Sequence, residues 1–132
     1  MKTMDKLKEL TAGLPNLVQS SDNGITQYKT IKGTAIGFGL MNESHVAVQR
    51  FFMSKGTIFP SHTHPENEVI VVYIGQFEHT VDCKTIILKT GESYHIPPNI
   101  CHSGIALEDT WMIAITVPGG KGYADVEGDN ND

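Results

Sequence analysis

The sequence predicts a single all-β domain, a sandwich or barrel of which the jelly roll is one form. Two observations lead to this class. From residue 27 onward the chain divides into short runs rich in β-branched and aromatic residues, separated by turn residues such as Lys32-Gly33, Gly75 and Thr90-Gly91. Many short strands at this spacing are typical of all-β sandwiches and barrels. The length of 132 residues suits one domain.

The first expected element is a short amphipathic helix. Apolar residues recur at near-helical spacing through residues 1–14, and Pro15 ends the pattern because proline cannot continue a helix. The apolar positions are Met4, Leu7, Leu10 and Leu14. The sequence therefore predicts one helix ahead of the β-rich part of the chain.

Ten strands are expected to follow, because each run carries strand-forming residues and is bounded by turn residues. The predicted ranges are 27–30, 35–41, 45–53, 57–62, 68–74, 77–81, 85–88, 93–96, 102–106 and 110–116.

Three parts of the chain follow from this pattern. Residues 1–26 are predicted to form the helix and an arm, residues 27–118 the barrel domain, and residues 119–132 a flexible acidic tail. The tail is expected because Val117-Pro118-Gly119-Gly120 ends the last strand and the remainder is rich in Gly and Asp.

Composition and charge exclude several classes of protein. The formal net charge is −5 and the Lys and Arg residues are scattered, so no basic stripe for nucleic acid is expected. No apolar run reaches the length of a membrane span or a signal peptide, which makes the cytoplasm the expected location. Cys83 and Cys101 are too few for a disulfide framework and are expected to be free thiols.

The residues that carry chemistry begin at His62. His62 and His64 are two positions apart, a spacing that places both side chains on one face of a strand but about 200° apart on a helix. Pro65 argues against a helix there, and the apolar run after Glu68 is typical of a buried strand. His102 follows the turn residues Pro97-Pro98-Asn99. This pattern predicts a metal site on a sheet.

These residues resemble the motifs of the cupin superfamily, whose members form small double-stranded β-helix (jelly-roll) barrels. The first cupin motif has the form G-x5-H-x-H-x3-E-x6-G, and every fixed position of it is matched here by Gly56, His62, His64, Glu68 and Gly75. The resemblance makes a small, single-domain, metal-binding cupin barrel the expected fold.

The second cupin motif, G-x5-P-x-G-x2-H-x3-N, is matched at Gly91, Pro97 and His102. Asn99 replaces the glycine, and the turn should survive because Asn tolerates left-handed backbone conformations. Ala106 replaces the final Asn, which removes a peripheral amide and leaves the metal site intact.

The resemblance implies that the metal ligands are His62, His64, Glu68 and His102. Three imidazoles and one carboxylate suit a divalent transition metal, Fe²⁺, Mn²⁺, Ni²⁺, Cu²⁺ or Zn²⁺, and are poor ligands for Ca²⁺ or Mg²⁺. Two positions of a six-coordinate ion would stay open for a substrate or O₂. Closed structural sites usually use cysteine, and neither cysteine falls at a ligand position.

Two residues are candidates for a catalytic role, Glu68 and His79. His79 alternates with the apolar residues Phe77 and Val81, so it should face the barrel interior near the pocket, although a satisfied core histidine is the alternative. His95 is expected to point away from the interior and to be structural, and His45 is expected in an exposed turn.

One strand leaves its orientation open. Gln49, Phe51 and Met53 share one face of the predicted strand 45–53, while Arg50 and Phe52 share the other. Either face could line the mouth of the pocket.

Three functions remain open at this point. The first is a dioxygenase-type oxidoreductase that uses Fe or Mn on a small organic substrate. The second is an isomerase or lyase in which the metal polarises a carbonyl group. The third is a binding or sensing module without turnover. In each case the expected partner is a small molecule, with no nucleic acid and no membrane, and both the unprotected sheet edges and the resemblance imply a homodimer.

Overall fold

The computed structural model describes residues 24–119, and this part of the chain consists of strands, with no helix. The ten strands are β1 (Ile25–Tyr28), β2 (Ala35–Asn42), β3 (Ala47–Met53), β4 (Ile58–His62), β5 (Asn67–Ile74), β6 (Gln76–Val81), β7 (Lys84–Lys89), β8 (Ser93–Ile96), β9 (His102–Ala106) and β10 (Thr110–Val117). The all-β expectation is confirmed.

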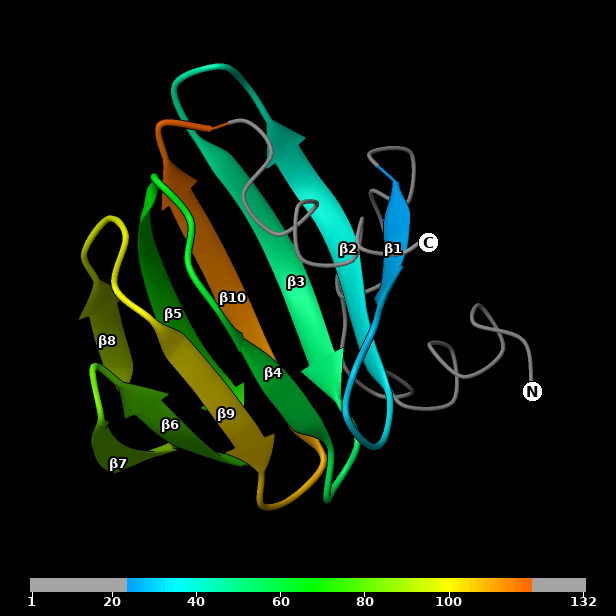
Figure 1. The fold of residues 1–132 in the computed structure, drawn as a ribbon. Coiled ribbons are helices and arrows are strands. Elements are labelled where there is room, and N and C mark those ends of the chain that lie inside the picture. Colours follow the sequence, from blue (N-terminus) through cyan, green and yellow to red (C-terminus); the bar gives the residue numbers. More distant parts are fainter. Residues whose placement is uncertain (1–23, 120–132) are drawn as a thin grey trace.

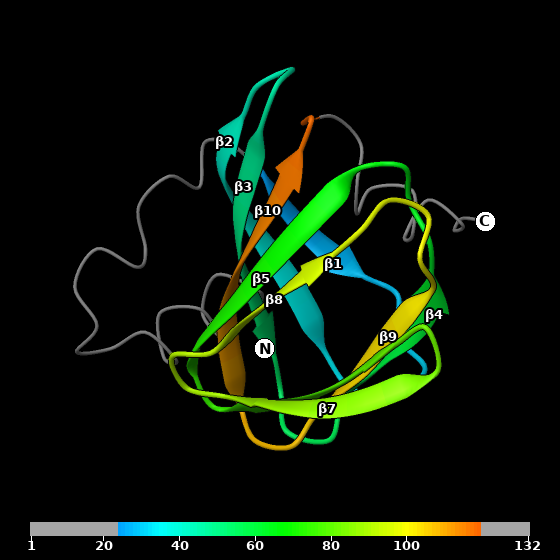
Figure 2. The same ribbon diagram turned by 90° about the vertical axis from the view of Figure 1, so that its left-hand side faces the viewer.

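The strands form two antiparallel sheets that face each other (Figures 1 and 2). The larger sheet has the order β1-β2-β3-β10-β5-β8, and the smaller sheet has the order β4-β9-β6-β7. From β3 onward the chain passes repeatedly from one sheet to the other, so that β5 and β10 lie in the larger sheet and β4, β6 and β9 in the smaller one. This alternation is the jelly-roll arrangement that the sequence predicted.

Each predicted strand corresponds to one observed strand, with small shifts at the ends. The largest shifts are at β1, which begins at Ile25 and ends at Tyr28, and at β3, which begins at Ala47. His45 belongs to the preceding turn, which is closed by a hydrogen bond of 2.9 Å from the N–H of Glu43 to the carbonyl of Val46. The helix predicted for residues 1–14 and nearly all of the predicted tail lie outside the described residues.

The hydrophobic core lies between the two sheets. Strand alternation sends every second residue inward, so one cluster collects Phe51 and Met53 of β3, Ile70 of β5, Phe77 of β6 and Met112 of β10. This resolves the open orientation of β3, because Phe51 and Met53 point to the interior.

A second apolar cluster lies on the opposite face of the larger sheet. It contains Ile36, Phe38, Phe52 and Trp111, with the rings of Phe52 and Trp111 5.0 Å apart. Phe51 and Phe52 are therefore chain neighbours that pack on opposite faces.

None of the described residues belongs to a helix long and apolar enough to cross a membrane.

Two glycines of the first motif have different reasons to be glycine. Gly56 and Gly75 both have positive φ, +86° and +104°. A Cβ at Gly75 would lie 2.5 Å from the carbonyl oxygen of Asp109, whereas a Cβ at Gly56 would meet nothing within 4 Å. Backbone conformation alone requires Gly56, and a close approach of two chain segments also requires Gly75.

We expect Gly75→Ala to destabilise the protein more than Gly56→Ala. The backbone cost common to both is about 1–2 kcal/mol, and overpacking against Asp109 adds about 1–3 kcal/mol at Gly75 only. Chemical denaturation of the two variants measures the difference in the free energy of unfolding. Equal losses in the free energy of unfolding would show that the close approach to Asp109 does not contribute to the cost at Gly75.

Candidate metal centre

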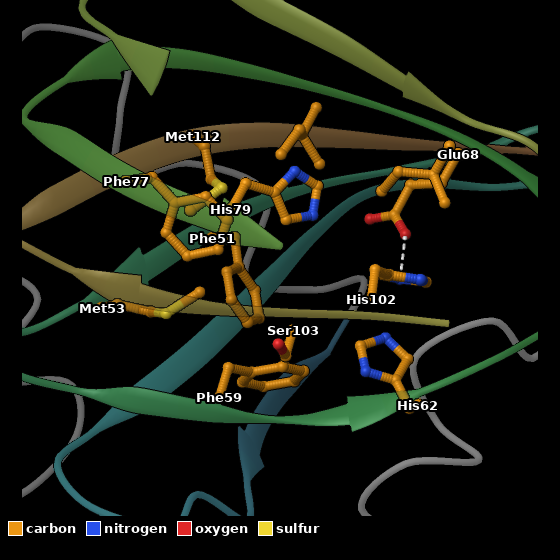
Figure 3. A pocket seen from close by; sticks show the side chains of 12 residues that line it. Phe51, Met53, Phe59, His62, Glu68, Phe77, His79, His102, Ser103 and Met112 are labelled. Atoms are coloured by element: carbon orange, nitrogen blue, oxygen red, sulfur yellow. Dashed lines mark ion pairs between the residues drawn. The ribbon is translucent and has the colours of Figure 1, made fainter. Parts of the chain in front are cut away.

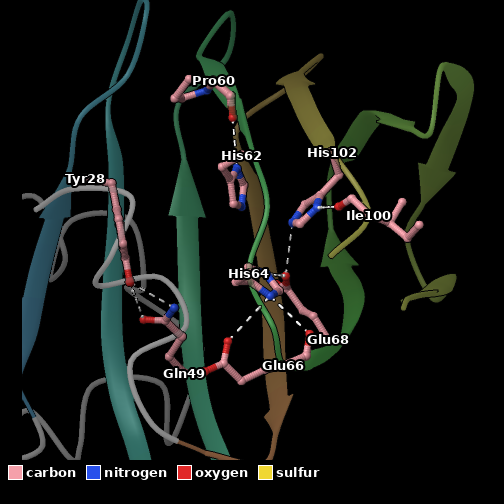
Figure 4. Close-up of polar contacts among 9 residues, drawn as sticks. All are labelled: Tyr28, Gln49, Pro60, His62, His64, Glu66, Glu68, Ile100 and His102. Carbon is pink, nitrogen blue, oxygen red and sulfur yellow. Dashed lines mark hydrogen bonds and ion pairs between the residues drawn. The ribbon is translucent and has the colours of Figure 1, made fainter. Parts of the chain in front are cut away.

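Three histidines converge where strands β4 and β9 meet (Figure 4). His62 is the last residue of β4, His102 is the first residue of β9, and His64 lies just beyond the end of β4. One ring nitrogen of each lies within 4.8 Å of one ring nitrogen of the others. The sequence grouped these three residues, and the structure brings them together.

A β-bulge turns His62 toward His102. In the pairing of β4 with β9, Phe59 lies opposite Gly104, and the register then shifts so that His62 lies opposite His102. Phe59 and His62 are three positions apart, and in a regular strand their side chains would point to opposite faces. The bulge allows Phe59 to line the core while His62 also points inward, with its ring 4.1 Å from that of His102.

His64 owes its position to a turn as well as to spacing. The strand ends at His62, so a shared strand face is only part of the reason that the two histidines converge. The backbone N–H of Asn99 donates a hydrogen bond of 2.8 Å to the carbonyl of His64. Asn99 has φ of 64°, the left-handed conformation expected of it. The turn before His102 therefore holds the segment that carries His64.

The Nδ1 atom of each histidine is engaged by a backbone carbonyl (Figure 4). The distances are 3.0 Å from His62 to Pro60, 3.1 Å from His64 to Glu66 and 2.8 Å from His102 to Ile100. Because a carbonyl oxygen only accepts hydrogen bonds, each Nδ1 must be the donor. The neutral form of each ring then carries its lone pair on Nε2, which is the atom available to a metal ion.

Glu68 reaches the histidines from the other sheet. It is the second residue of β5 and is fully buried, with 0% of its surface exposed. Its Oε1 lies 2.9 Å from Nε2 of His64 and 3.4 Å from Nε2 of His102. Its Oε2 is also buried and makes no hydrogen bond. A buried carboxylate oxygen without a donor is a candidate metal ligand.

Electrostatics couple Glu68 to the imidazoles. Burial alone would raise the pKa of Glu68, but hydrogen bonding and charge attraction from His102 and His64 lower the pKa below its ordinary value. Burial alone would lower the pKa of His64, but the carboxylate of Glu68 raises it. Burial, reinforced by His102, lowers the pKa of His62 to about 4. The carboxylate of Glu68 thus favours a positive charge beside it.

The donor set fits a divalent transition metal. Imidazole nitrogens and one carboxylate are the ligands that such ions take, and the Nε2 atoms and the Glu68 carboxylate converge on one region. The structure groups the three histidines and the glutamate that the sequence singled out.

A second carboxylate near the site did not emerge from the sequence. Oε1 of Glu66 is buried, makes no hydrogen bond and lies 3.7 Å from Nδ1 of His64. Glu66 lies in a bend just before β5, so strand alternation does not predict the direction of its side chain.

A pocket opens beside the histidines and is mostly apolar (Figure 3). It contains about 310 Å³ of space, part of it open to solvent. Its lining residues are Phe51, Met53, Phe59, His62, Glu68, Ile70, Phe77, His79, Ile96, His102, Ser103 and Met112.

His79 faces into this pocket, as its alternation with Phe77 and Val81 predicted. It is 2% exposed, and its Nδ1 is buried without a hydrogen bond. Its ring lies 5.2 Å from that of Phe77 and 6.0 Å from that of His102. Burial, with a further contribution from His102, lowers the pKa of His79 to about 4, so the imidazole is neutral at neutral pH.

The remaining candidates lie away from the pocket, as expected. His95 is exposed and its Nε2 lies 2.9 Å from Oδ1 of Asn67. His45 is exposed. Cys83 and Cys101 are exposed and free.

Comparisons with known proteins agree with this architecture. A model of the family described as "Cupin domain" matches residues 49–118. Among curated proteins, H2HPP isomerase of Bacillus subtilis is 30% identical over 118 residues, which is 89% of this chain. The chain spans only 45% of the length of that relative.

Solved structures show the same fold. An RmlC-like cupin from Shewanella frigidimarina matches with a TM-score of 0.66 at 21% identity, covering 74% of this chain and 87% of its own. KdgF from Halomonas sp. matches with a TM-score of 0.66 at 18% identity, covering 74% and 89%. A predicted oxalate decarboxylase from Thermotoga maritima matches with a TM-score of 0.67 at 18% identity, covering 77% and 98%.

Replacing His62 and His64 together with Ala should remove a bound divalent transition metal and leave the barrel folded. His62 ends β4 and His64 lies just beyond it, and neither belongs to the apolar core cluster. Elemental analysis after loading and desalting measures the metal per chain, and circular dichroism checks the fold. Replacing His45 and His95 with Ala is the matched control, which should keep its metal. A double variant at 62 and 64 with full metal content would contradict the ligand assignment.

The buried His79 should make the chelator-treated protein less stable in acid. The unfolded chain takes up this proton near pH 6.5 and the folded chain only near pH 4, so the stabilising contribution is present above pH 6.5 and is lost as the pH falls toward 4. The loss is about 3 kcal/mol. Denaturation of His79→Gln between pH 7 and pH 4 should give a shallower decline than the wild type. Parallel declines would contradict a buried neutral His79.

Proposed function

This chain belongs to the cupin domain family, and from that premise we propose that it is a metal-dependent isomerase of a small substrate that carries a carbonyl group. His62, His64, Glu68 and His102 would hold a divalent ion, with Fe²⁺, Mn²⁺, Ni²⁺, Cu²⁺ and Zn²⁺ as the candidates. The observation that carries the proposal is His79, a buried neutral imidazole with an unbonded Nδ1 that faces the pocket beside this set.

When bound, such an ion would act as a Lewis acid and polarise the substrate carbonyl. The chain supplies the rest. Glu68 provides one negative charge, and its burial keeps water from weakening that charge. The three Nδ1 hydrogen bonds to backbone carbonyls fix the orientation of the imidazoles, which preserves the geometry of the site.

His79 would carry the proton. Polarisation acidifies the carbon next to a carbonyl, and a neutral imidazole within reach removes a proton from that carbon. In a substrate with a carbon–carbon double bond one carbon beyond the acidified carbon, His79 then returns the proton to the far carbon of that double bond. The double bond moves into conjugation with the carbonyl group, atoms and electrons balance, and no oxidant is needed. Glu68, whose Oε2 makes no hydrogen bond, is the second group that could hold a proton during the exchange.

The relative from Bacillus subtilis supports isomerisation, because its name is that of an isomerase. The resemblance therefore favours the reaction type.

A dioxygenase-type oxidoreductase is the second candidate. The mostly apolar lining of the pocket favours it, because Phe51, Met53 and Met112 give O₂ an apolar environment beside the metal set. The ion that His62, His64, Glu68 and His102 would hold would then supply the redox chemistry that a reaction with O₂ requires. A binding module without turnover is the third candidate, and the experiment below separates all three.

A homodimer in the cytoplasm completes the proposal. Within residues 24–119, both sheets end in edge strands, β1 and β8 in the larger and β4 and β7 in the smaller. Unpaired edges favour pairing with a second copy.

Exchange of substrate hydrogen tests the role of His79. Metal-loaded protein is incubated in D₂O with small 2-oxo acids, and deuterium incorporation next to the carbonyl is followed by NMR. We expect His79→Gln to lower the exchange rate about 10²-fold or more, the usual range for a general base, with metal content unchanged. His95→Gln is the matched control, because His95 is exposed and lies outside the pocket.

The same reactions run with and without oxygen distinguish the candidates. Equal rates in both support isomerisation. Consumption of substrate only with oxygen present would contradict it and support the dioxygenase. Ligand binding without exchange or consumption would leave the binding module.

A further inference from the structure

Few polar side chains of the pocket remain once the proposed metal ligands are set aside. Of the pocket-lining residues in the described part of the chain, the polar ones are His62, Glu68, His79, His102 and Ser103. Three of these belong to the metal set. The body of a bound ligand is therefore left with two polar side chains, His79 and Ser103, and otherwise with apolar walls.

The pocket also supplies little positive charge. No Lys or Arg is among its lining residues in the segment 24–119. The lining holds one carboxyl group, that of Glu68, and three imidazoles, those of His62, His79 and His102. A divalent ion next to Glu68 leaves a net charge of +1, enough to balance one negative charge on a ligand. A second anionic group would be buried without a counter-charge, which is strongly unfavourable.

The apolar side chains of the pocket also limit how many hydroxyl groups a ligand can carry. Phe51 and Phe59 pack edge to face with their rings 5.6 Å apart, and Phe77, Met53 and Met112 continue the same apolar surface (Figure 3). Hydroxyl groups of a ligand body held against these side chains would lose their hydrogen bonds to water and gain none. Each unsatisfied hydroxyl costs about 1–3 kcal/mol.

We infer that this site takes a small ligand with one chelating, singly charged oxygen group and an apolar body, and that it rejects dianions, phosphate esters and polyols. The apolar body would lie against Phe51 and Phe59, with the chelating group toward His62 and His102. The inference names the substrate class of the proposed metal site and rests on that proposed function.

Three 2-oxo acids that share one chelating group test the inference. The first is 2-oxoglutarate, which has a second carboxylate at its far end. The second is 5-methyl-2-oxohexanoate, in which an isopropyl group of similar size replaces that carboxylate. The third is 2-oxogluconate, whose body carries hydroxyl groups. Isothermal titration of metal-loaded protein should give a dissociation constant for 5-methyl-2-oxohexanoate about tenfold or more below those of the other two, because one uncompensated group costs at least about 1.4 kcal/mol.

A pair of variants localises the apolar contact. Phe51→Leu should weaken binding of 5-methyl-2-oxohexanoate about three- to tenfold through lost contact area. Phe52→Leu is the matched control, since Phe52 is the next residue of β3, is equally buried and packs on the opposite face of the sheet. It should leave the dissociation constant unchanged. Equal effects of the two variants would contradict the proposed position of the ligand.

Titration of chelator-treated protein distinguishes a wrong ligand class from a wrong proposed function. If binding depends on metal but the affinity for 2-oxoglutarate or 2-oxogluconate equals or exceeds that for 5-methyl-2-oxohexanoate, the inference is overturned. The proposed metal site would then still stand. Binding that prefers the apolar probe but does not depend on metal would contradict the proposed function. The inference would also be overturned if the apolar probe failed to bind metal-loaded protein at millimolar concentration.

Discussion

The rest of the site depends on the buried carboxylate of Glu68, which meets the imidazoles of His64 and His102 at 2.9 Å and 3.4 Å. A carboxylate without solvent contact is tolerated only when positive or donor groups compensate it. Glu68 belongs to the larger sheet, while His102 begins a strand of the smaller one. The contact therefore fixes the separation of the two sheets at this end of the barrel. It also explains why the site favours a cation.

The apolar pocket and the polar centre reinforce each other. Charges in a dry environment interact more strongly than charges in water, so the phenylalanine and methionine walls strengthen the attraction between Glu68 and any cation beside it. The same burial keeps His79 neutral, which makes it a proton acceptor rather than a second positive charge. One physical cause, exclusion of water, therefore gives both the affinity for a cation and the basic form of His79. It also limits the ligands that the pocket can hold.

Much of this arrangement could be predicted from the sequence because strand alternation is a local property. The inward orientation of His79 followed from Phe77 and Val81, and the left-handed backbone at Asn99 followed from the chemistry of its side chain. The bulge between Phe59 and His62 could not be predicted, because it depends on the pairing of β4 with β9. Strand alternation also divided the side chains of β3 into two sets, but it could not decide which set points to the interior. That choice depends on the opposite sheet, which lies far away in the sequence.

The most direct test of the metal centre is anomalous diffraction from crystals of the protein loaded with zinc. We expect one anomalous peak per chain, about 2.0–2.2 Å from Nε2 of His62, His64 and His102 and from a carboxylate oxygen of Glu68. A peak bound by other residues, or fully loaded crystals with no peak between these four side chains, would contradict it.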